Sequence, residues 1–194
     1  MASKVGIANA ALVELGQDRI TSLDQDTEAA RVVNDVYDEL RLTLLQEHPW
    51  NFATRRRELP LLAETPYFGY AAAFELPVDC LRVLATNPET TEYRIEGRKL
   101  LCNRKQVSIQ YVGDVTDSNL MPPTFRAALA ALIAAKVAPK LSPDKKGDME
   151  VLASRSKAAA RSADSTGGGS VQAVRPNAYV ASRRGRVGSN EEDA

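Results

Sequence analysis

Apolar residues recur at steps of three and four positions near the start of the chain, and this spacing predicts two amphipathic helices. The first runs from Ser3, which can cap its start, to Leu15. Gly16 follows directly and supplies the stop, because glycine tolerates the left-handed conformation that often follows a helix.

The second helix is the longest pattern in the sequence. An acidic loop precedes it, and Asp24 or Asp26 can accept hydrogen bonds from the free N–H groups of its first turn. It ends near His48, because Pro49 disfavours helical geometry in the residue before it. Its apolar stripe contains Ala29, Val33, Val36, Tyr37, Leu40, Leu44 and Leu45.

The pattern changes between positions 51 and 115, where prolines interrupt every candidate helix. Short runs with strand character replace the helical spacing, and Glu96-Gly97 has the composition of a hairpin turn. We therefore expect a small antiparallel sheet inserted into a helical frame. The expected strands are Tyr67 to Leu76, Leu81 to Ala85, Tyr93 to Ile95, Lys99 to Cys102 and Val107 to Val112.

Helical spacing resumes after Met121-Pro122-Pro123 and continues to Pro139, which we expect to end or kink that helix. A fourth helix is predicted from Ser142-Pro143-Asp144, with Ser142 as its cap. The predicted fold is thus mainly α: a four-helix bundle with an inserted small antiparallel β domain and an extended C-terminal arm. The boundaries place the bundle at 1–50 and 120–164, the β-rich domain at 51–119 and the arm at 165–194.

Composition narrows the function classes. The chain carries 25 Lys and Arg against 25 Asp and Glu, so its formal charge is zero and gives no global attraction to nucleic acid or to an anionic membrane. No apolar run approaches the roughly 20 residues of a membrane span. Cys80 and Cys102 are far apart in sequence, and with one His they do not form a structural zinc set, so we expect no metal and no cofactor.

The only His and the only Trp lie three positions apart around a proline. A catalytic His48 would need a nucleophile or an orienting carboxylate in a closed pocket, and no accompanying motif provides one. We therefore expect no catalytic residue and interpret His48, Pro49, Trp50 and Phe52 as a structural corner. In this interpretation both rings point into the core, and His48 hydrogen-bonds the local backbone.

Two basic runs admit more than one interpretation. Arg55-Arg56-Arg57 is either a solvated or salt-bridging edge, or a contact with a partner chain or with nucleic-acid phosphates. The last residues, after the linker-like STGGGS, contain four Arg and few apolar residues, so they cannot bury enough apolar surface to fold alone. This arm is either disordered or becomes ordered against another chain.

The motifs, taken in order, resemble a known family. "HPWNFATRR" after the long helix is the most specific, and "LPVDCLRVL" and "VSIQYVGDV…MPPTF" support it. Through about residue 160 the chain resembles the head-to-tail adaptor proteins of tailed bacteriophages, of the tail tubular protein A type. Some relatives have been credited with cell-wall hydrolysis, but no motif for it occurs here.

The resemblance implies a virion protein of the tail connector, assembled in the host cytoplasm. It implies a ring of copies, typically twelve, which docks on the portal protein, extends the DNA channel and carries the downstream tail or nozzle protein. Genomic DNA would pass without sequence-specific binding, and no membrane is involved. In relatives the C-terminal segment reaches the portal. By position alone, the portal-contact candidates are Val171, Val174, Arg175, Tyr179, Arg183, Arg184 and Arg186.

Two alternatives from other classes remain open from the sequence. The first is a DNA-binding packaging accessory protein that uses the Arg clusters. The second is a virion-associated cell-wall hydrolase. Binding to duplex DNA at several salt concentrations distinguishes the first from an adaptor, since phosphate contacts weaken steeply with salt.

Overall fold

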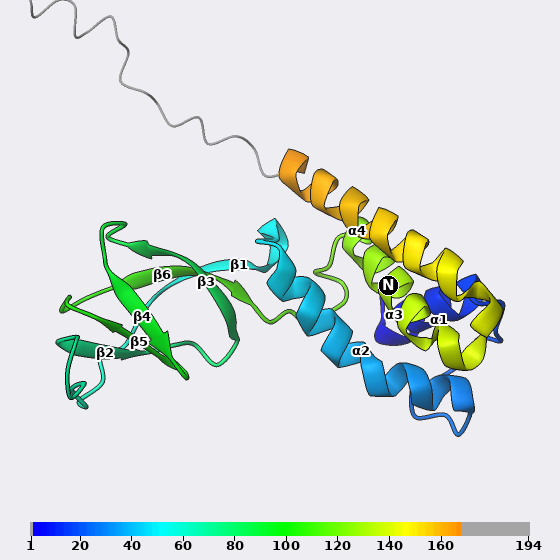
Figure 1. Ribbon diagram of the computed structural model, residues 1–194, viewed down its shortest axis with the longest axis horizontal. Helices are drawn as coiled ribbons and strands as arrows, with labels where there is room; N and C mark the ends of the chain where they lie inside the picture. Colours follow the sequence, from blue (N-terminus) through cyan, green and yellow to red (C-terminus); the bar gives the residue numbers. More distant parts are fainter. Residues whose placement is uncertain (1, 168–194) are drawn as a thin grey trace, which may run out of the picture.

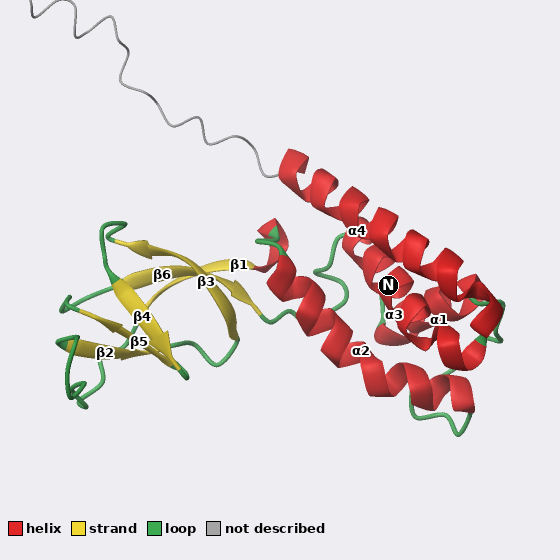
Figure 2. Ribbon diagram, in the orientation of Figure 1, coloured by secondary structure: helices red, strands yellow, loops and turns green. Residues whose placement is uncertain are grey.

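The computed structural model describes residues 2–167, which form a helical part and a strand part arranged along the long axis of the molecule (Figure 1). Helices and strands occupy separate parts of the molecule (Figure 2), and the helices come from both ends of this range and the strands from its middle. The α-helices are α1 (Lys4–Glu14), α2 (Glu28–Glu47), α3 (Pro123–Leu141) and α4 (Lys146–Gly167). The strands are β1 (Thr54–Glu58), β2 (Ala72–Glu75), β3 (Cys80–Asn87), β4 (Tyr93–Glu96), β5 (Lys99–Cys102) and β6 (Ser108–Gly113). One-turn 3₁₀ helices, Asn51–Ala53 and Pro143–Lys145, precede β1 and α4.

Local hydrogen bonds account for the ends of α1 and α2. The Ser3 hydroxyl accepts the backbone N–H of Gly6 at 3.0 Å, and Gly16 adopts a φ of 71°, so both predicted ends of α1 are confirmed. The cap of α2 is Thr27, whose hydroxyl accepts the N–H of Ala30 at 3.3 Å. The expectation of an aspartate cap was wrong because Thr27 is the residue directly before the helix.

Helix α3 is central to the helical part and packs against α1, α2 and α4. Its buried surface is rich in alanine, which lets the neighbouring helices approach closely. Pro139 lies in the last turn and the helix continues to Leu141, since a missing N–H so near the end removes little. Ser142 does not cap the last helix. Its hydroxyl donates to the carbonyl oxygen of Leu15 at 3.0 Å and so ties this turn to the end of α1.

The strands form two three-stranded antiparallel sheets, in the orders β1-β6-β3 and β2-β5-β4. The predicted hairpin is confirmed between β4 and β5, where Gly97 has a φ of 57°. Only Ala72–Glu75 of the expected strand from Tyr67 to Leu76 forms a strand. The preceding residues form an exposed loop that contains Pro66 and Gly69. Strand β1 was not predicted, because its sequence TRRRE has no alternation of apolar and polar residues.

Two apolar clusters hold these parts together. The larger one joins the four helices and reaches Ala53, Val112 and Val115 at the start and end of the strand region. The smaller one lies between the sheets. It contains Leu59, Phe74, Leu76, Leu100, Cys102, Val107, Ile109 and Tyr111.

The mainly α, four-helix-bundle prediction is therefore wrong: residues 2–167 form a mixed fold of helices and two sheets. The periodicity identified the four helices but underestimated the strand part. One sheet was expected, whereas the strands divide into two sheets with a shared apolar cluster, and this arrangement depends on pairing between distant segments, such as β1 with β6. Helix α4 also extends to Gly167, three residues beyond the expected end of the helical bundle at residue 164.

Candidate functional site

The corner between α2 and β1 is built around Trp50. Its side chain is 1% exposed, and its indole N–H donates to the carbonyl oxygen of Leu44 at 2.8 Å. The ring centroid lies 5.0 Å from that of Phe125 on α3, edge to face, and 4.7 Å from the ring of His48. Phe52 is partly buried and contacts Phe125 in the same way, at 4.9 Å. The chain therefore turns from helix to strand around an aromatic cluster.

The same corner binds the end of α4. His48 Nε2 lies 3.2 Å from Oδ2 of Asp164, so its partner is a carboxylate in a distant helix and not the local backbone that we expected. The backbone N–H of Asn51 donates to the Asp164 carboxylate at 3.1 Å, and the Asn51 amide donates to the Asp164 carbonyl oxygen at 2.7 Å. One turn of α4 is thereby fixed to the corner. This contact joins residues that are 116 positions apart, so no local sequence signal announces it.

Ion pairs from Glu47 also hold α4 against the corner. Glu47, the last residue of α2, pairs with Lys157 at 3.0 Å and with Arg161 at 2.6 Å. These side chains are about one-third exposed, so the pairs contribute modestly to stability. Together with Asp164 they fix the C-terminal end of α4 at a defined position beside the corner.

Arg41 forms a buried ionic link between α2 and the end of the strand part. Its residue is 3% exposed, and its guanidinium contacts Asp38 at 3.1 Å, Asp114 and the carbonyl oxygen of Val115 at 2.9 Å. Burial by itself would raise the pKa of Asp38, but hydrogen bonds from Arg41 and Lys4 outweigh it, so the pKa lies below its usual value. The link positions the strand part against the long helix.

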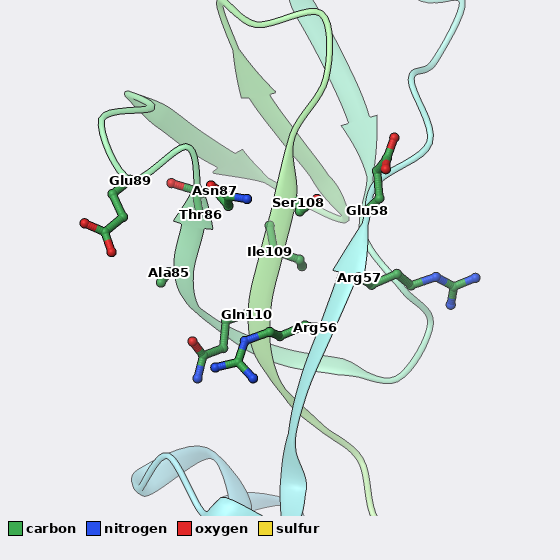
Figure 3. A pocket seen from close by; sticks show the side chains of 10 residues that line it. All are labelled: Arg56, Arg57, Glu58, Ala85, Thr86, Asn87, Glu89, Ser108, Ile109 and Gln110. Carbon is green, nitrogen blue, oxygen red and sulfur yellow. The ribbon is translucent and has the colours of Figure 1, made fainter. Parts of the chain in front are cut away.

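The basic run does not form one patch. Arg55 pairs with Asp79, which also accepts the Tyr111 hydroxyl at 3.2 Å. Arg56 lies beside Gln110 on one side of the sheet, and Arg57 points to the other side (Figure 3). A depression of about 550 Å³ follows this sheet, and its walls carry Glu58 and Glu89 as well as the two arginines. The mixture of signs does not favour a strong anion site there.

Two aromatic side chains on the loop before β2 are almost fully exposed. Tyr67 is 101% exposed and Phe68 is 89% exposed, whereas large aromatic rings are usually buried. Gly69 follows with a φ of 83°, a conformation that other residues rarely adopt. Lys99 pairs with Glu64 beside this loop. The loop lies at the end of the strand part that is remote from the helices (Figure 1), and an aromatic tip with charged neighbours is typical of a protein contact surface.

Three other expectations concern the C-terminal arm, the two cysteines and metal binding. The portal-contact candidates, from Val171 to Arg186, lie outside the described residues. Cys80 and Cys102 are both free thiols; Cys102 is buried and Cys80 packs against the same apolar cluster, and burial raises the pKa of the Cys80 thiol. Within residues 2–167 no group of His, Cys, Asp and Glu is arranged to hold a metal ion.

The sequence matches no protein-family model and no curated protein. No helix in residues 2–167 combines the length and the apolar character needed to cross a membrane.

Proposed function

We propose that the protein is a structural head-to-tail adaptor of a tailed bacteriophage, without an enzymatic role. Copies of the chain form a ring that docks on the portal protein, extends the DNA channel and presents a platform to the next tail component. The motifs "HPWNFATRR" and "VSIQYVGDV…MPPTF" support this proposal through their resemblance to that family. A mixed fold with an independent strand part is compatible with it.

The observation that carries the proposal is the separation of two contact regions. At one region the last turn of α4 is fixed to the corner by Asp164, so that the residues after Gly167 start from a defined point. At the other, Tyr67 and Phe68 lie exposed on a loop at the far end of the strand part (Figure 1). A protein that joins two larger assemblies needs two separate regions of this kind.

Assembly would follow from this arrangement. The C-terminal arm contacts the portal protein, and the Tyr67–Phe68 loop contacts the downstream tail protein. A segment that folds onto its partner when it binds makes ring formation depend on that partner. Genomic DNA passes through the ring without sequence-specific contacts, in keeping with the zero formal charge of the chain.

Sedimentation velocity of the purified chain, alone and with the portal protein of the phage that encodes it, tests the proposal. The chain alone should sediment as a monomer and should join the portal ring in a stoichiometric complex. A chain that leaves the portal boundary unchanged would contradict the adaptor role. Stable rings without the portal would retain the adaptor role but exclude assembly on the portal as a template.

A DNA-binding packaging accessory is the second candidate. It is favoured by one observation: neither Arg56 nor Arg57 has a carboxylate partner within residues 2–167, although both are exposed. Their opposite directions weigh against a shared phosphate surface. Tight binding of the purified chain to duplex DNA, with a steep loss at higher salt, would favour this candidate over the adaptor.

A further inference from the structure

A recess of about 360 Å³ lies where α4 meets the corner. Its walls are mostly apolar, and its floor includes the buried rings of Trp50 and Phe125. Asp164 is the only ionisable residue that lines it. The full lining consists of Trp50, Asn51, Phe52, Pro122, Thr124, Phe125, Ala163, Asp164 and Gly167.

Helix α4 ends beside this recess, because Gly167 is both its last residue and part of the lining. The next residues are Gly168, Gly169 and Ser170, whose small side chains place few limits on the backbone direction. Val171 and Val174 are the first large apolar residues after them. Residues 168–174 begin beside the recess, because Gly167 is part of its lining. At roughly 3.3–3.6 Å per residue, these seven residues are long enough to turn back and reach it.

The chemistry of this segment also matches the recess. Two valines offer the apolar surface that aromatic walls accept. Arg175 is the first charged residue after Gly167, and Asp164, which lines the recess and also contacts His48 and Asn51, carries the opposite charge.

We propose that the recess binds the chain's own residues 171–175, with Val171 and Val174 against the Phe52 and Trp50 rings and Arg175 near Asp164. The recess is then a holding site: the start of the C-terminal segment stays on its own corner until a stronger partner displaces it. This intramolecular docking does not require the adaptor role. If the adaptor role is correct, a portal would compete with the recess for the same residues.

The single tryptophan makes the test direct, because Trp50 gives one indole N–H signal in a ¹H–¹⁵N spectrum. Three proteins are compared: the full chain, a chain ending at Gly167, and the full chain with Val171→Asp and Val174→Asp. In the full chain we expect nuclear Overhauser contacts between valine methyl groups and the Trp50 or Phe52 ring. We expect these contacts to be lost, and the indole signal to shift by the same amount, in the truncated chain and in the double variant.

Two further variants separate the recess from general effects on α4. Ala163→Arg fills the recess from an exposed position and should abolish the methyl contacts. Ala158→Arg is exposed on the same helix but outside the lining, and should leave them intact. Both substitutions introduce the same side chain, so a loss confined to Ala163→Arg identifies the recess.

Three results would overturn the inference. One is an indole signal that is identical in the full and truncated chains. Another is a set of methyl contacts that survives Ala163→Arg. The third is a shift that disappears on dilution or contacts that arise only between differently labelled copies, which would make a second copy the occupant. A normal portal interaction in any of these cases would leave the adaptor role untouched.

Discussion

His48 and Asp164 lie 3.2 Å apart, Nε2 to Oδ2, and join the end of α2 to the last turns of α4. The only histidine of the chain thus belongs to a set of hydrogen bonds between the corner and α4, in which the Asp164 carboxylate also accepts the N–H of Asn51. These hydrogen bonds fix the point at which the C-terminal segment leaves the fold.

Removal of this carboxylate should loosen the end of α4. Asp164→Ala leaves the Asn51 N–H and His48 without their partner, and a lost hydrogen bond to a charged group costs about 1.5–3 kcal/mol. We expect the urea midpoint to fall with an unchanged slope. Ser162→Ala, at an exposed position of the same helix, is the control and should change little. An equal midpoint in both variants would show that the corner does not hold α4.

Arg41 should contribute far more to stability than Arg31, an exposed arginine on the same helix. Arg41→Ala removes a buried guanidinium and leaves Asp114 without its partner, which should cost about 3–5 kcal/mol. Arg31→Ala breaks an exposed pair with Asp26 and should cost less than about 1 kcal/mol. Denaturant unfolding of both variants measures the difference. Similar costs would contradict a structural role for the link between α2 and the strand part.

The ion pairs of Asp38 should make stability depend on acid pH. Its pKa in the folded chain lies below the ordinary value of 3.8, so the folded state favours the ionised carboxylate. The stabilisation is present above the unfolded pKa and is lost as the pH falls through the folded pKa. The free energy of unfolding of the wild type should therefore exceed that of Asp38→Asn at pH 7, and the gap should begin to narrow near the ordinary pKa of 3.8 and narrow further as the pH falls. A gap that stays constant over this range would exclude the ionised Asp38 as the cause.

The exposed aromatic loop should be dispensable for folding and required for binding. Tyr67→Ser with Phe68→Ser removes rings that no other part of residues 2–167 buries, so the stability should change by less than about 0.5 kcal/mol. Under the proposed function, affinity for the downstream tail protein should fall by about 30-fold or more, as at an aromatic hot spot. Val151→Ser, on α4, is a half-exposed apolar control that should leave this affinity unchanged. Equal binding by both variants would remove the loop from the interface.

Elements with a local pattern in the sequence could be predicted, whereas elements that depend on distant contacts could not. Periodicity located the helices, since Val33, Tyr37, Leu44 and Leu45 all lie in the helical core. It missed β1, whose arginines sit on an edge strand where only the backbone pairs with β6. It also extended a strand over Tyr67 and Phe68, because aromatic residues favour strands wherever they occur.

The site shows the same limit. The corner residues were recognisable from the break at Pro49, but the partner of His48 was not, because Asp164 approaches only after the helices have packed. The recess beside it is likewise formed by three separate segments of the chain, residues 50–52, residues 122–125 and the end of α4 at residues 163–167. Such sites become visible only in three dimensions.

The central claim is that this chain is an adaptor in a phage particle, and the most direct measurement of it is an electron cryo-microscopy reconstruction of the mature particles made by the genome that encodes the chain. The adaptor account predicts a ring of this fold beneath the portal, with its C-terminal segments directed at the portal and its Tyr67–Phe68 loops at the next tail protein. A particle whose connector lacks this fold, or a ring inverted with respect to these two surfaces, would contradict it.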